Sequence, residues 1–178
     1  MSFLEENLEE LNEQFIEDFR GFCTALVEQN RDVFRELREL LIAIPSFCYL
    51  IIMLPSGNRE NNLNIAITGL TITLSFFKDN KSIVFQMQAI LGEAFFEKFQ
   101  KNWGDSSVNL DSAVESFEKA ITIFPEENAL DEEILAELQD KLGLAYFKRS
   151  QIKGNPNDLE KAIKAYESAL NRHLQNRK

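Results

Sequence analysis

The chain contains few of the residues that interrupt a fold or cross-link it. Its 178 residues include four prolines, seven glycines and two cysteines. So little proline and glycine excludes long low-complexity linkers and predicts an ordered chain. Two cysteines are too few for the disulfide framework of a small secreted protein. Cys23 and Cys48 both stand among apolar neighbours, and we expect them to be buried free thiols.

Basic residues and histidine are also scarce. Nineteen Lys and Arg stand against 29 Asp and Glu, for a net charge of −10, which disfavours binding to nucleic acids and to anionic lipid surfaces. The single histidine, His173, has no second histidine or spaced cysteine pair with which to bind a metal. There is no phosphate-binding glycine loop. We therefore expect no metal, no cofactor and no enzyme activity.

The sequence has no apolar run of the length that crosses a membrane. The most apolar region, residues 40–55, falls short of the roughly 20 residues that a spanning helix needs, and Pro45 interrupts it. The first six residues are acidic where a signal peptide would be basic. We expect an acidic cytoplasmic protein without a membrane span.

Apolar residues instead recur every three or four positions, as on one face of a helix. The first such stripe comprises Leu4, Leu8, Leu11, Phe15, Phe19, Phe22 and Leu26. It predicts a helix near residues 3–28. A second helix is predicted over residues 31–44, ending before Pro45 because proline disfavours helical backbone in the residue before it. These two helices carry a net charge of −7 within residues 1–44.

The rest of the chain is repetitive. Leu91 and Leu142 are 51 residues apart, and Ala113 and Ala162 are 49 apart. The two copies are Leu91, Gly92, Phe95, Ala113, Phe117 and Ala120, and Leu142, Gly143, Tyr146, Ala162, Tyr166 and Ala169. A fixed period of this size indicates stacked helix pairs, which usually build a surface that holds another molecule.

A third copy begins with Leu63 and Ala66. Residues 65–74 have the composition of a strand, but the repeat register predicts a helix there. The predicted helices of the repeats are 46–54, 61–77, 81–101, 109–124, 130–152 and 158–174. The residues predicted to cap the second helix of each pair are Asn62, Asn109 and Asp158. Those predicted to end the preceding helices are Gly57, Gly104 and Gly154.

The repeated residues fall in the order of the tetratricopeptide repeat (TPR) pattern. With a period near 50, residues 44–170 resemble the extended TPR arrays common in cyanobacterial proteins. Residues 47–76 resemble the entry to arrays in proteins that carry a caspase-like CHAT domain, which this chain lacks. The resemblance implies an all-α fold of antiparallel helix pairs (46–77, 81–124 and 130–174) stacked as a short right-handed superhelix over residues 45–178. The two helices within residues 1–44 would pack on it.

The resemblance also implies a concave face that is lined by the first helix of each pair. It places there Gln86, Glu93, Phe96, Glu97, Glu137, Asp140, Leu144, Phe147 and Lys148. Alternatively, these are ordinary solvated or packed residues, as most charged helix faces are. TPR domains that clamp a C-terminal carboxylate use Lys, Asn and Arg on this face, whereas several of these positions hold carboxylates here. A basic or aromatic peptide is therefore the expected ligand.

The resulting functional hypothesis is a protein–protein interaction module, a scaffold or adaptor. One alternative is a regulatory or sensor subunit of a larger system, such as one with a caspase-like partner. Another is a small helical ligand-binding protein or enzyme with an apolar pocket beside residues 47–54. The last apolar stripe has no polar capping helix after it, so we expect it to pack against another copy of the chain or against a further C-terminal domain. That stripe comprises Ile163, Tyr166, Ala169, Leu170 and Leu174.

Overall fold

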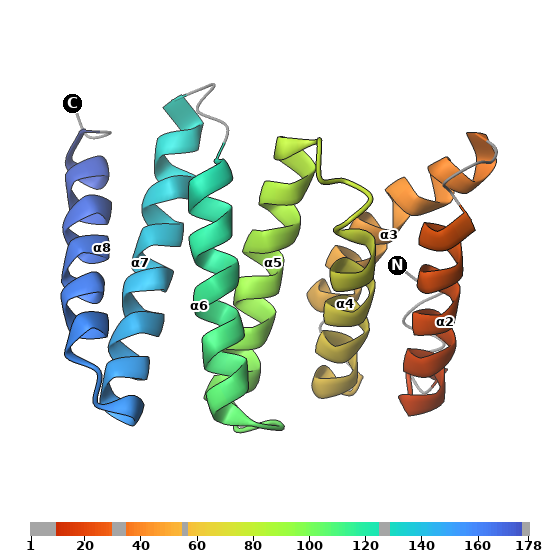
Figure 1. Cartoon of the computed structure of the whole chain (residues 1–178), viewed down its shortest axis with the longest axis horizontal. Helices are drawn as coiled ribbons and strands as arrows, with labels where there is room; N and C mark the ends of the chain where they lie inside the picture. Colours follow the sequence, from red (N-terminus) through yellow and green to blue (C-terminus); the bar gives the residue numbers. More distant parts are fainter. Residues whose placement is uncertain (1–9, 30–34, 55–56, 125–128, 176–178) are drawn as a thin grey trace. The chain divides into compact units, whose positions relative to one another are not determined.

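The computed structural model describes residues 10–29, 35–54, 57–124 and 129–175, and these ranges contain seven α-helices and no strand (Figure 1). The all-α prediction is confirmed for them. The chain forms two compact units, Met1–Asp79 and Asn80–Lys178. The predicted beginning of the first helix, at residues 3–9, lies outside the described ranges.

The first unit contains α2 (Glu13–Gln29), α3 (Arg35–Met53) and α4 (Arg59–Thr73). Helix α4 packs against both α2 and α3. The side chains that are fully buried in this unit include Cys23, Leu41, Cys48, Ile51, Leu63, Ile65 and Leu70. The core of the unit thus draws on all three helices.

The buried stripe of α2 differs from the predicted one. Leu11, Phe19 and Leu26 are buried as expected, but Phe22 is 47% exposed and Cys23 is fully buried. The prediction for Phe22 is therefore wrong. On a helix of 3.6 residues per turn, Phe22 falls at the margin of the buried side, whereas Cys23 lies between Ile16 and Phe19, which are both buried.

Helix α3 runs through Pro45, so the prediction of a helix end before this residue is wrong. A proline inside a helix removes one hydrogen bond and costs about 3 kcal/mol. The buried stripe continues across it, because Leu41, Ile44, Cys48 and Ile51 follow one another in steps of three or four residues. Burial of each large apolar side chain contributes roughly 1.5–3 kcal/mol, which outweighs the cost. The domain boundary predicted between residues 44 and 45 falls inside this helix.

The residues of α4 with strand propensity form a helix, as the repeat register predicts. Asn58 caps it by accepting a hydrogen bond from the Asn61 amide at 3.1 Å. The Thr73 hydroxyl donates to the Gly69 carbonyl at 2.7 Å, so this threonine is satisfied inside the helix. Burial of Ile65 and Leu70 decides the conformation over intrinsic propensity.

The second unit contains α5 (Lys81–Gln100), α6 (Ser106–Ile123), α7 (Ala129–Lys153) and α8 (Pro156–Gln175). Helix α5 pairs with α6 and α7 pairs with α8, each pair antiparallel, and α6 also packs against α7 (Figure 1). Side chains of α5, α6, α7 and α8 share one core cluster. The two helix pairs are therefore continuous through the contact of α6 with α7.

The capping residues lie three or four positions earlier than predicted. Backbone amides at the helix starts donate to the side chains of Asn58, Asp105 and Asn155. The predicted caps, Asn62, Asn109 and Asp158, are instead buried within the helices. The Asn109 amide, for example, donates to the Trp103 carbonyl at 2.7 Å. Asn109 and Asp158 thus bind the preceding segment and the preceding helix rather than the helix start, and the capping role predicted for the three positions is wrong.

Glycines in the first helices allow the pairs to pack closely. A Cβ atom added to Gly92 of α5 would lie 2.5 Å from the Phe117 ring of α6. One added to Gly143 of α7 would lie 3.0 Å from the Tyr166 ring of α8. Real Cβ atoms do not approach ring carbons as closely as 2.5 Å, so Gly92 sets the distance between α5 and α6.

The two glycines allow a matched test. Phe117 is fully buried and cannot retreat from a methyl group, whereas Tyr166 is 39% exposed and can. We predict that Gly92→Ala lowers the free energy of unfolding by about 1–3 kcal/mol. Gly143→Ala should cost less than half as much, because the exposed Tyr166 ring can move away from the added methyl group, while the gain in helix propensity is common to both substitutions. Urea denaturation followed by Trp103 fluorescence measures both, and equal losses would contradict the steric explanation.

The thiols of the first unit are free and fully buried, as predicted. Burial raises the pKa of Cys23 from near 9 to about 11 and that of Cys48 to about 12. The thiolate is the reactive form. At pH 8 we therefore predict that both thiols of the native protein react with Ellman's reagent at least about 100-fold more slowly than in 6 M guanidinium chloride. Comparable rates in the two conditions would show that the thiols are accessible.

Candidate functional site

The face predicted to hold a partner is formed by α5 and α7, the first helices of the two pairs. The ammonium group of Lys141 on α7 pairs with the carboxylate of Glu93 on α5. Both side chains are about half exposed, so this ion pair stabilises the fold by no more than about 1 kcal/mol. It also shows that side chains of α5 and α7 meet at this point. We refer to the nine predicted residues as the α5/α7 face.

On α5, the predicted residues differ in accessibility. Gln86 and Glu93 are exposed, and Glu97 is half-buried. Phe96 is buried and belongs to the core cluster, where its ring lies 5.8 Å from that of Phe99. The outer surface of α5 at this face is therefore polar and carries two carboxylates.

On α7, the predicted residues combine charge with partly covered apolar surface. Glu137 is exposed, and the carboxylate of Asp140 lies 3.2 Å from Nε2 of His173 on α8. Leu144 and Phe147 are half-buried and pack against the core cluster. Lys148 is half-buried as well. The face thus presents carboxylates beside the exposed edges of two apolar side chains.

A second group of polar side chains joins three helices of this unit, and we call it the Arg149 cluster. Its members are Asp111 and Glu118 of α6, Tyr146, Arg149 and Lys153 of α7, and Asp158 and Lys161 of α8. Arg149 donates from Nε and Nη2 to the two carboxylate oxygens of Asp158, both at 2.8 Å. It also donates to Asp111 at 3.4 Å. One guanidinium group therefore bridges α7 to both neighbours.

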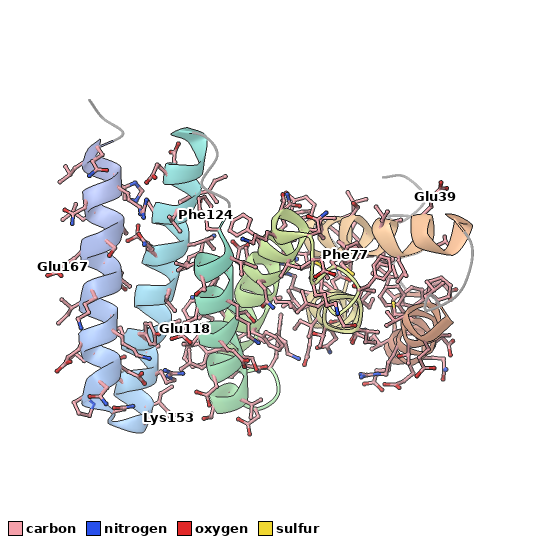
Figure 2. All side chains as sticks on the ribbon, turned by 45° about the horizontal axis from the view of Figure 1, so that its top comes forward. Glu39, Phe77, Glu118, Phe124, Lys153 and Glu167 are labelled. Atoms are coloured by element: carbon pink, nitrogen blue, oxygen red, sulfur yellow. The ribbon has the colours of Figure 1, made fainter. Side chains whose placement is uncertain are left out.

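Tyr146 lies at the centre of this cluster. Its hydroxyl donates to Glu118, which is labelled between the helices in Figure 2. The Arg149 guanidinium and the Lys161 ammonium lie 5.4 and 5.1 Å from the centre of its ring, in the range of cation–π interactions. Burial, followed by the hydrogen bond to Glu118, raises the pKa of Tyr146. The phenol is therefore neutral at pH 7.

Hydrogen bonding fixes the protonation state of the ion pair in the cluster. The hydrogen bonds from Arg149 lower the pKa of Asp158 and raise that of Arg149. These shifts move both pKa values further from pH 7, so both groups stay charged. General acid–base catalysis instead favours a pKa near the working pH. The cluster therefore has a structural role, in which it holds α7 to α6 and α8. The sequence predicted a capping role for Asp158 and not this ion pair, although Arg149 and Asp158 flank the turn at Gly154.

The residues that the structure describes offer neither a metal site nor a membrane-spanning helix. None of their His, Cys, Asp and Glu side chains form a group of three or more that could hold a metal ion. Nor does any helix in those ranges have the length and apolar character needed to cross a membrane.

A sequence profile of the tetratricopeptide repeat matches residues 144–172, which cover the end of α7, the turn and most of α8. No curated protein and no solved structure matches the chain. Together with the antiparallel helix pairs, the profile match shows an all-α, TPR-like fold. Repeats of this class generally mediate protein–protein interactions.

The Arg149 cluster gives a testable stability difference. Asp158 is 3% exposed, and breaking a buried ion pair costs about 3–5 kcal/mol. Because the Arg149 side chain is 18% exposed, we predict a loss of roughly 2–3 kcal/mol for Asp158→Asn. The exposed pair of Glu115 and Lys119 provides the control, and Glu115→Gln should cost less than about 0.5 kcal/mol.

The same variant has a pH signature. Because the pKa of Asp158 is lower in the folded than in the unfolded protein, its contribution is present above the unfolded pKa of about 4 and is lost as the pH falls through the folded pKa. The stability difference between wild type and Asp158→Asn should therefore shrink below pH 4. A difference that stays constant from pH 7 to pH 3 would show that the carboxylate charge is not its source.

Proposed function

We propose that this chain holds a partner protein or peptide on its α5/α7 face. The observation that carries the proposal is the tetratricopeptide match to residues 144–172, since helical repeats of this kind use extended helix-lined surfaces for binding. The polar outer surface of α5, next to the mixed surface of α7, suits a ligand that lies across the two first helices.

The charges of the face favour a basic ligand. Carboxylates come from both helices, with Glu93 on α5 and Glu137 and Asp140 on α7. Such a surface attracts cationic segments and repels acidic ones, including a C-terminal carboxylate. The exposed edges of Leu144 and Phe147 offer apolar contact to an aromatic side chain. A basic peptide with an aromatic anchor matches both properties.

We predict that Glu137→Lys abolishes capture of partner proteins from a lysate of the source cells. Glu137 is exposed, so the substitution should leave the fold intact while it reverses a charge on the face. Glu115→Lys is the matched control, because it makes the same charge change on an exposed position of α6. Quantitative mass spectrometry of the retained proteins measures the effect. Equal retention by wild type and both variants would refute binding at this face.

The resemblance of residues 47–76 to the entry of caspase-associated arrays supports a more specific version of this proposal. In it, the chain is a regulatory or sensor subunit whose partner carries a caspase-like domain. The same capture experiment separates the two versions by the identity of the retained protein.

A further inference from the structure

Helix α8 has an apolar stripe that the described residues cover only in part. Its side chains are 39–58% exposed and follow one another in steps of three or four residues, namely Leu159, Ile163, Tyr166, Leu170 and Leu174. The residues that α8 buries, Ala162 and Ala169, lie to one side of this stripe. Single exposed apolar residues are ordinary, but a continuous stripe on one helix marks an interaction surface.

The same stripe occurs 49 residues earlier on α6, where it is covered. Leu110 and Phe117, which correspond to Leu159 and Tyr166, are fully buried, and Val114 is 1% exposed. They share a core cluster with residues of α7, among them Leu138, Leu142 and Tyr146. The α6 stripe thus shows which kind of element could cover the equivalent stripe of α8. It is a helix with the apolar pattern of α7.

The polar contacts that hold α7 on α6 are repeated as well. Asp111 pairs with Arg149 and Lys153, and Glu118 accepts from the Tyr146 hydroxyl. At the same offset of 49 residues, α8 carries Glu160 in place of Asp111 and Glu167 in place of Glu118. Both carboxylates needed to receive an α7-like helix are therefore present on α8.

On α8 these carboxylates are unused. Glu160 and Glu167 are exposed, and neither forms a hydrogen bond or ion pair with any residue that the structure describes. Glu167 projects away from α7 in Figure 2. Lys164 lies between them on the same flank of the helix and is exposed too. The flank carries a net charge of −1 beside the apolar stripe, which favours a cationic partner.

We propose that α8 docks an amphipathic helix of another protein, with an apolar stripe spaced as in α7 and with Arg or Lys in its last turns. The basic side chains would pair with Glu160 as Arg149 and Lys153 pair with Asp111, and Glu167 would accept a hydrogen bond from the docked helix as Glu118 does from Tyr146. A second copy of the chain fits less well, because two α8 flanks would bring four carboxylates together with two copies of Lys164. This surface lies on a different helix from the α5/α7 face and does not depend on it.

The chain itself supplies the probe, a labelled peptide with the sequence of α7, residues 129–153. We expect saturable binding to the full chain by fluorescence anisotropy. The double variant Glu160→Lys/Glu167→Lys should weaken it at least tenfold. Leu170→Ser should weaken it as well, and because Leu170 is 58% exposed, this substitution should leave helicity unchanged. Glu17→Lys/Glu115→Lys, at exposed positions of α2 and α6, is the matched control and should bind as wild type does.

A charge-swapped peptide makes the test specific. The peptide carrying Arg149→Glu and Lys153→Glu should bind wild type weakly and regain affinity for the Glu160→Lys/Glu167→Lys chain. Peptide binding that is insensitive to all the α8 substitutions would overturn the proposal, because it would place the peptide elsewhere, for instance on α6 in exchange for α7. A dimer in light scattering that Leu170→Ser converts to a monomer would also overturn it, in favour of a second copy. Glu137→Lys should leave peptide binding unchanged, so the two surfaces are tested separately.

Discussion

The close approach of paired helices at glycine is the constraint on which each unit depends. At Gly92 an aromatic ring of the facing helix occupies the place where a Cβ atom would stand, and at Gly143 a ring lies close against it. At Gly69 the same space is filled by Cys48 and Phe19. Glycine normally weakens a helix interior. Here the loss of helix stability is offset because aromatic rings and the Cys48 thiol pack against the glycines. A side chain at these positions would keep the paired helices further apart.

This constraint repeats along the second unit, and with it the surface that each second helix presents. Once Phe117 is placed against Gly92, the remaining side of α6 has to be covered by another helix, and α7 does so with apolar and ionic contacts. The Tyr166 ring stands in the same relation to Gly143, which leaves α8 with an equivalent side that the described residues cover only in part. The exposed stripe of α8 is therefore a consequence of the repeat and not an accident of composition.

Much of the fold could be predicted because the repeat register carries information that local propensity lacks. It identified α4 as a helix although Ile65 and Thr73 favour strands. Local rules failed where burial overrode them, as at Pro45 inside α3 and at Phe22 on α2. The Arg149 cluster could not be found from spacing, since Asp111 and Arg149 are 38 residues apart. The α5/α7 face rests on the family resemblance, and its role in binding remains a prediction.

The distribution of charge connects the two proposed surfaces. Within the Arg149 cluster, cationic groups pair with carboxylates, and these ion pairs link α6, α7 and α8. Glu93 and Glu137 of the α5/α7 face and Glu160 and Glu167 of α8 are exposed, and of these four Glu93 pairs with Lys141. If both proposed surfaces bind partners, this distribution of charge would favour cationic ones at each of them. The proposed α8 surface would add a requirement that charge alone does not impose, because its apolar stripe would favour a partner that is helical and apolar on one side.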